Sequence, residues 1–164
     1  MVLLYKDAFT GDELCTDVYP CKEIENGMGL VFTGAMVQVK DGVEGFENND
    51  EEGGALEDGV RTVVNIVEYN SLEQTAFDKK SFQVFLKSYV KKILKHLEEK
   101  HPDQVADFKA NATGFVKYLI SNFKEFDFYQ GASMDPEGGV VMNMWEGETP
   151  LFIFFKHGLE EEKL

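Results

Sequence analysis

The chain has 164 residues, a length typical of one domain, and 43% of them are hydrophobic, which is enough to build a core. Its 16 Lys and Arg residues against 30 Asp and Glu residues give a net charge of -14, which argues against nucleic acid as a main ligand, because phosphate is bound by lysine and arginine. No apolar run approaches the roughly 20 residues that span a bilayer. Met1–Asp7 also lacks the layout of a signal peptide, so we expect a cytoplasmic protein that does not bind membranes.

Residues 1–40 have the pattern of short strands joined by turns. An apolar run opens the chain and is followed by residues of turn composition. Gly29–Phe32 and Ala35–Lys40 then flank Thr33-Gly34, which predicts a two-residue hairpin joining two strands.

Asp41–Gly59 is acidic, with eight Asp or Glu residues, five glycines and no basic residue. Such a stretch cannot bury enough apolar surface to offset its ordering entropy, so we expect a flexible loop. Asp50, Glu51 and Glu52 are candidate ligands for Ca²⁺, which prefers oxygen ligands. The spacing is not that of an EF-hand, so binding should be weak, on the order of 10⁻⁴–10⁻³ M. The alternative is a loop that is merely solvated, and no tightly bound cofactor is expected.

Strand composition resumes over Val60–Tyr69, and two amphipathic helices follow within residues 78–124. In both, apolar residues recur at the spacing of one helical face. Asp78 is a suitable N-cap for the first helix, and Pro102 enforces its end and suits the start of the second. Because the connection is this short, we expect an antiparallel helical hairpin.

Three further strands are predicted after the helices, over Phe126–Gln130, Gly138–Trp145 and Leu151–Lys156. Turns rich in Gly and Pro separate them. Strands at both ends of the chain with one helical hairpin between them predict a single α+β domain over residues 1–164.

The charge is distributed unevenly. The segment Lys79–Lys124 holds ten lysines and four acidic residues, whereas the remainder of the chain is strongly acidic. An amphipathic helix needs a solvated face, and lysine is a good helix former, so a purely structural explanation exists. The scarcity of acids among these lysines favours binding to an acidic protein such as tubulin. The candidate binding residues are Lys79, Lys80, Lys87, Lys91, Lys92 and Lys95.

No catalytic signature is present in the sequence: it contains no P-loop, dinucleotide fingerprint, nucleophile elbow or HExxH motif. His96, His101 and His157 are scattered along the sequence, and no CxxC pair is available for zinc. Cys15 and Cys21 are expected to be reduced thiols. We therefore do not expect an enzyme.

Several segments together resemble the translationally controlled tumour protein (TCTP) family from end to end. Tyr5-Lys6-Asp7 and Gly11–Leu14 are similar to the opening of that family, and the acidic loop follows in the same order. The most specific segments are Phe126–Met134 and Phe154–Lys163.

The resemblance implies a fold and several activities. The fold would be a small twisted mixed β-sheet core, a β-tent like that of Rab-binding exchange and chaperone proteins, with a protruding helical hairpin and an acidic flexible loop. The family is associated with calcium binding, microtubule stabilisation, growth control and cell survival, and its tubulin-binding region corresponds to the hairpin. An alternative implied role is regulation, exchange-factor-like or chaperone-like, of a Ras-family small GTPase such as Rheb, with Asp12 and Glu13 as contact residues.

Two departures from the family limit what is carried over. The loop is short, and the usual Ser-Ala-Glu-Gly signature within it is reduced to Glu51–Ala55, which weakens the calcium assignment. Many relatives end in Cys, whereas this chain ends in Leu164. We therefore expect a monomer, without a dimer linked by a terminal disulfide.

Overall fold

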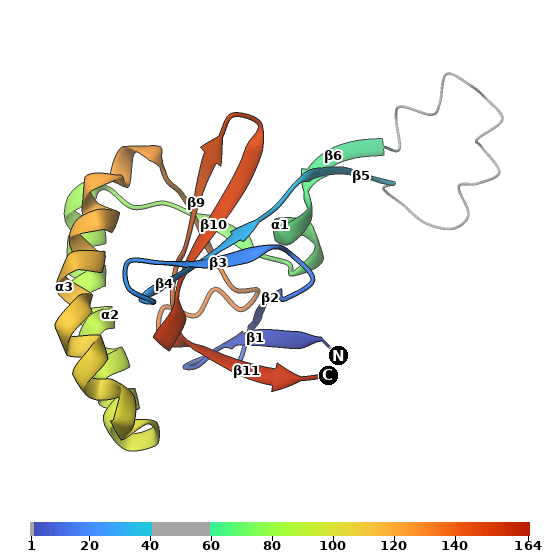
Figure 1. The fold of residues 1–164 in the computed structure, drawn as a ribbon. Helices are drawn as coiled ribbons and strands as arrows, with labels where there is room; N and C mark the ends of the chain where they lie inside the picture. The colour runs from blue at the N-terminus through green and yellow to red at the C-terminus, as the bar shows by residue number, and fades with distance from the viewer. Residues whose placement is uncertain (1, 41–59) are drawn as a thin grey trace, which may run out of the picture.

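The computed structural model describes residues 2–40 and 60–164, and Figure 1 shows how their helices and strands are arranged. The strands are β1 (Leu3–Asp7), β2 (Glu13–Thr16), β3 (Cys21–Ile24), β4 (Gly29–Thr33), β5 (Met36–Lys40), β6 (Val60–Val64), β7 (Glu73–Thr75), β8 (Asp127–Gln130), β9 (Val141–Glu146), β10 (Thr149–Phe155) and β11 (Leu159–Lys163). The α-helices are α1 (Asn65–Tyr69), α2 (Lys79–Lys100) and α3 (Val105–Ser121). Three 3₁₀ turns, η3 (Pro102–Gln104), η4 (Phe123–Glu125) and η5 (Lys156–Gly158), complete the order.

Three sheets form the body of the part of the chain that the structure describes. The largest has the strand order β3-β4-β10-β9-β8-β7, a second has the order β11-β1-β2, and β5 pairs with β6 in a two-stranded ribbon. Every pairing in the described ranges is antiparallel. Because β1 pairs with β11, the two ends of the chain lie side by side (Figure 1). The expected α+β class is confirmed.

The centre of the six-stranded sheet is buried on both faces. Along β10, Phe152 and Phe154 belong to the core shared with the three-stranded sheet and α1, whereas Ile153 and Phe155 belong to the core shared with α2 and α3. This division follows from the two-residue side-chain period of a strand. It explains why β10 is continuously apolar after Thr149 rather than alternating.

The two long helices form the expected hairpin, which lies across one face of the six-stranded sheet (Figure 1). Asp78 caps α2 in a reciprocal capping box, in which its carboxylate accepts from the Ser81 backbone N–H at 2.7 Å and the Ser81 hydroxyl accepts from the Asp78 N–H at 3.1 Å. His101 leaves helical geometry before Pro102, as expected. The buried faces are formed by Phe82, Leu86, Tyr89, Ile93 and Leu97 of α2 and by Phe108, Ala112, Phe115 and Leu119 of α3. In the described ranges, no helix is both long enough and apolar enough to cross a bilayer.

The hairpin turn predicted at Thr33-Gly34 is wrong. β4 pairs with β3 and β10, whereas β5 pairs with β6. Two contacts hold the chain extended at this point: the Gly34 N–H donates to the Pro150 carbonyl at 2.9 Å, and the Ala35 N–H donates to the Asn65 side chain at 3.0 Å. The backbone donors of the supposed turn are therefore bonded to distant segments.

The strand predicted over Val60–Tyr69 is correct only in its first half. β6 ends at Val64, and Asn65 begins the short helix α1. The Asn65 side-chain oxygen accepts from the Ile66 N–H at 2.7 Å, a local bond that competes with strand pairing. Strands β7 and β11 were not predicted, since β7 has three residues and β11 is acidic.

Candidate partner-binding surface

Five of the six candidate lysines are exposed along α2. They are Lys79, Lys80, Lys87, Lys91 and Lys95, and none of them forms an ion pair with a residue that the structure describes. Lys87, Lys91 and Lys95 follow one another at intervals of four residues, so they lie on one side of the helix. Within residues 2–40 and 60–164 no acidic side chain pairs with these lysines, so they form a basic surface on an acidic protein.

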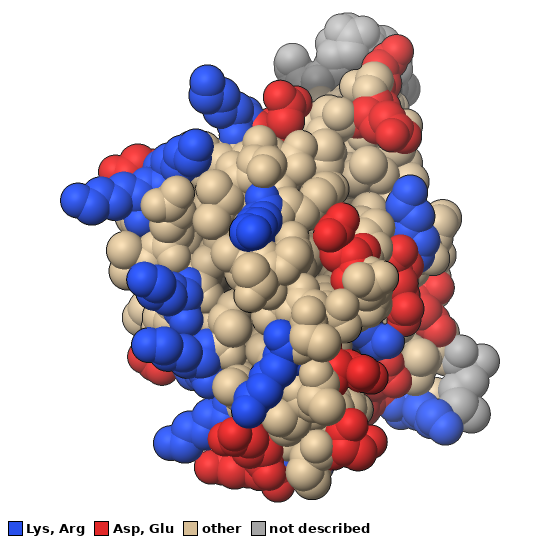
Figure 2. Space-filling view, turned by 60° about the vertical axis from the view of Figure 1, so that its left-hand side comes forward, with Lys and Arg blue, Asp and Glu red and all other residues tan. Residues whose placement is uncertain are grey.

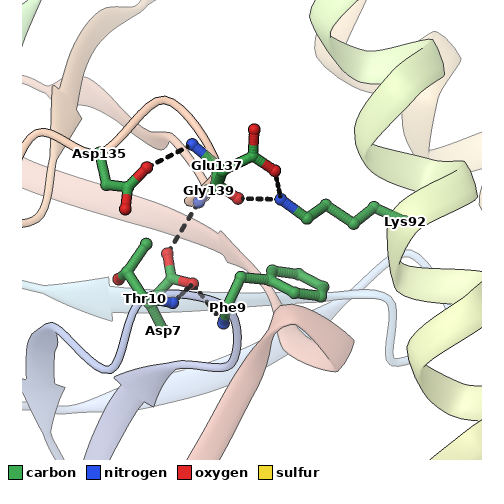
Figure 3. A network of polar contacts seen from close by, with 7 residues as sticks. All are labelled: Asp7, Phe9, Thr10, Lys92, Asp135, Glu137 and Gly139. Atoms are coloured by element: carbon green, nitrogen blue, oxygen red, sulfur yellow. Dashed lines mark hydrogen bonds and ion pairs between the residues drawn. The ribbon is translucent and has the colours of Figure 1, made fainter.

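The sixth lysine, Lys92, has a different environment. Its ammonium group contacts the Glu137 carboxylate at 2.6 Å, donates to the Glu137 carbonyl, and lies 4.8 Å from the centre of the Phe9 ring (Figure 3). Its side chain is 30% exposed. Lys92 therefore joins α2 to the loop before β9 and to the N-terminal turn, instead of lying with the five exposed lysines.

An apolar groove of about 590 Å³ runs between α2 and α3 on the surface of the hairpin. Its most buried lining residues are Leu86 and Ala112, and its sides are formed by Val84, Val90, Val116 and Ile120. Lys80, Lys87 and Lys91 also line it, whereas no acidic residue of the described part of the chain does. Figure 2, in which the hairpin side faces forward, shows lysines spaced over a largely uncharged central surface, with most acidic residues on the right-hand side and lower edge and a few at the upper and left edges.

The two candidate GTPase-contact residues differ in their availability. The Asp12 carboxylate is half-buried and accepts from the Ser133 hydroxyl at 2.6 Å and from the Ser133 N–H at 3.3 Å. A Cβ atom on Gly131 would lie 2.5 Å from Asp12, so this contact requires glycine there. Glu13, at the start of β2, is exposed. Of the pair, Glu13 is the residue that a partner can reach.

A buried carboxylate explains why the N-terminal turn is well defined. Asp7 is 4% exposed, and one of its oxygens accepts from the N–H groups of Phe9 and Thr10 at 2.8 and 3.2 Å. Its other oxygen accepts from the Gly139 N–H at 2.7 Å (Figure 3). Because a buried carboxylate must be fully hydrogen-bonded, these contacts fix the turn against the loop that also holds Lys92.

The three histidines, scattered in the sequence, meet at one cavity. His96, His101 and His157 line a hollow of about 550 Å³ together with Glu160 and Glu161. The His96 imidazole lies 3.8 Å from the Glu160 carboxylate. Burial, and then the neighbouring Lys156, lower the pKa of His157, whose buried Nδ1 atom has no hydrogen-bond partner among the residues that the structure describes. No group of three or more metal-binding side chains is assembled among the described residues.

The predicted calcium ligands Asp50, Glu51 and Glu52 lie outside the described residues, so their assignment stays a prediction. The two cysteines, by contrast, are free: Cys15 is buried and Cys21 is exposed. Burial raises the pKa of the Cys15 thiol to about 12, which keeps it protonated and unreactive at neutral pH.

The groove was not found by pattern analysis. Val90, Val116 and Ile120 continue the apolar spacing of the two helices, and the structure places them at the outer edge of the buried faces, half-buried. Val84 lies outside the stripe and is 63% exposed. An exposed apolar residue between Lys80 and Lys87 was the available signal, but it does not reveal which residues of α3 lie opposite.

An antiparallel β-sheet body with one helical hairpin across a sheet face defines the structural class. The family model for translationally controlled tumour protein matches residues 2–160. The translationally-controlled tumor protein homolog of Schizosaccharomyces pombe is 44% identical to the chain, with 99% of both sequences covered. The homolog from Yarrowia lipolytica is 40% identical, with 99% of this chain and 100% of the relative covered.

A solved structure extends the comparison to three dimensions. The Translationally Controlled Tumor-associated Protein p23fyp from Schizosaccharomyces pombe is similar to the chain with a TM-score of 0.82 and 42% sequence identity, and 99% of each chain is covered. The chain belongs to the translationally controlled tumour protein family.

Proposed function

We propose that the chain is a partner-binding protein whose hairpin docks on an acidic protein surface, with tubulin as the partner that its family membership favours. One observation carries this proposal: five lysines are exposed along α2, and none forms an ion pair with a described residue. Attraction between such a surface and an acidic partner speeds association and weakens as salt rises, because exposed charges are screened.

A matched pair of charge reversals tests the docking. Lys87→Glu with Lys91→Glu should abolish co-sedimentation with microtubules at low salt. Lys22→Glu with Lys163→Glu is the control, because it changes the net charge equally at two exposed positions outside the hairpin. The control should retain most of the binding. Equal loss in both variants would mean that only net charge matters, and undiminished binding of the first variant would refute the proposal.

A second candidate function is regulation of a Ras-family small GTPase such as Rheb through Glu13. The exposure of Glu13, next to an Asp12 held by Ser133, favours Glu13 as the contacting carboxylate. Glu13→Ala should slow nucleotide release from the GTPase without changing the melting temperature of the chain. If the rate of release is the same with Glu13→Ala as with the unmodified protein, this function is rejected.

Weak calcium binding by Asp50, Glu51 and Glu52 is a third property that family membership supports. Calorimetric titration of Ca²⁺ into the full chain and into a variant lacking residues 41–59 tests it. Equal heats in the two titrations would remove these acidic residues as ligands.

A further inference from the structure

The groove between α2 and α3 combines an apolar interior with a basic border. Leu86 is fully buried and Ala112 is 7% exposed, so these two lie deepest, whereas Val84 is 63% exposed. Lys80, Lys87 and Lys91 lie along the same side of it. Lysines alone would suit any anionic surface, but a row of lysines beside an apolar strip suits a ligand that is acidic and apolar on the same face.

We propose that this groove binds an acidic amphipathic helix of a partner protein. The inference rests on the proposed docking function and specifies its chemistry. From Lys80 to Lys91 the groove extends about 16 Å along α2, taking 1.5 Å per residue, which matches about three turns of a bound helix. Apolar residues of that helix at i, i+3/i+4 and i+7 would enter the groove, and its flanking carboxylates would reach the lysines.

The surroundings favour a helix over an extended segment. An extended peptide binds by adding to a sheet edge, where unpaired backbone groups are available. The sides of this groove belong to α2 and α3, whose backbone groups are bonded within each helix, so the groove offers side chains alone. A helix satisfies its own backbone and needs only side-chain contacts.

A second copy of the chain and a fatty acid fit less well. If two copies met through this groove, Lys87 and Lys91 of one copy would lie near Lys87 and Lys91 of the other. Repulsion between these like charges disfavours that contact. A small amphiphile is held in a pocket that buries about 70–90% of its surface. This groove lies open along the surface of the hairpin, so it cannot enclose an acyl chain in that way.

Replacing Val84 by Lys distinguishes binding in the apolar groove from binding by charge attraction alone, because the two explanations predict opposite changes in affinity. Added positive charge would tighten binding to a purely electrostatic surface. If the apolar groove receives the ligand, Val84→Lys should weaken binding about tenfold, since an apolar contact is lost. Position 84 is exposed and lysine is a good helix former, so the fold should be retained.

A second substitution blocks the groove from α3 without changing charge. Thr113 is exposed and lines the groove, so Thr113→Phe should fill it and abolish binding. Ala110→Phe is the matched control, because Ala110 is exposed on the same helix but does not line the groove. The control should bind as the unmodified protein does.

The probe is a fluorescein-labelled peptide of about 18 residues with leucines at i, i+3, i+4 and i+7, a few glutamates beside them and alanines elsewhere, long enough to form a helix. The glutamates are kept few because like charges four residues apart destabilise a helix. The partner probe has the same composition with the leucines dispersed. Fluorescence anisotropy at low and moderate salt should detect binding of the first peptide and at least about tenfold weaker binding of the second. Circular dichroism of each protein variant confirms its helical content.

Three results would overturn the inference: unchanged or tighter binding by Val84→Lys, equal binding of both peptides, or binding of oleate without binding of the amphipathic peptide. These results differ from failure of tubulin docking. If the lysine reversals leave microtubule binding intact, tubulin docking at this surface is rejected, whereas the peptide measurements decide the groove independently.

Discussion

The hairpin helps to line two cavities of almost equal volume, about 590 and 550 Å³. The side chains that line them differ in polarity and charge. The groove between α2 and α3 is apolar, and its lysines have no described acidic partner. The histidine cavity is polar, and its lining mixes His96 and Lys156 with Glu160 and Glu161. Two of the residues that line the second cavity have an acidic neighbour: Lys156 lies 2.7 Å from Glu23, and His96 lies 3.8 Å from Glu160. Volume alone therefore does not distinguish the two cavities, and the proposed docking depends on charge without a described partner beside exposed apolar area.

The largest effect we expect comes from removing the packing under the hairpin. Phe115 is fully buried, and its ring centre lies 4.8 Å from that of Phe155. Phe115→Ala should lower the free energy of unfolding by about 3–5 kcal/mol, because it leaves a cavity in the core beneath α3. Urea denaturation measures this change. The nearby exposed Thr113→Ala should have little effect, and equal values for the two variants would contradict the packing described here.

A smaller effect should separate a compensated lysine from an uncompensated one. Lys92→Gln removes a contact with Glu137 and a position over the Phe9 ring, so it should lower the free energy of unfolding by about 1 kcal/mol. Lys91→Gln, one residue earlier and exposed, should change it by less than about 0.5 kcal/mol. Microtubule binding should show the reverse order, with the larger loss for Lys91→Gln. If Lys92→Gln instead weakened binding more, the distinction between the two lysines would be wrong.

The smallest effect we expect is a pH dependence that originates in the histidine cavity. Burial holds the pKa of His157 below its ordinary value of about 6.5, so the unfolded chain takes up a proton there at a higher pH than the folded chain does. This contribution to stability is complete above about pH 6.5 and is lost as the pH falls below it toward the folded pKa. His157→Gln should reduce the loss of stability between about pH 7.5 and pH 5.5.

Urea midpoints at the two pH values test this expectation. Gln104 lines the same cavity and carries no titrating proton, so Gln104→Ala should leave the pH dependence as in the unmodified chain. A pH dependence unaffected by His157→Gln would show that other groups account for it. A comparable change in both variants would point to the cavity as a whole.

Local signals in the sequence predicted the hairpin well. Asp78 caps α2 and Pro102 follows its end as expected, by chemistry that acts within a few residues. Pro102 begins the 3₁₀ turn η3, however, and the second helix α3 starts only at Val105. Five of the six candidate lysines are exposed for a similar reason, since the apolar stripe of α2 fixes which side meets the body.

Long-range contacts were not accessible in the same way. Lys92 differs from Lys91 because Glu137, 45 residues later, reaches it. Thr33-Gly34 fails to turn because Pro150 and Asn65 bond the neighbouring backbone donors. No pattern within a short window contains either partner.

The sequence by itself determined the helical hairpin, its basic character and the α+β class, because spacing, capping and charge act locally along the chain. The tertiary structure determined which of those lysines stay exposed beside the groove and which one is paired with an acidic residue. Packing α3 beside α2 created the groove and set Val84, Val116 and the lysines around it, while the loop at Glu137 withdrew Lys92 from that surface. Whether a charged side chain is available to a partner depends on which other segments fold against it.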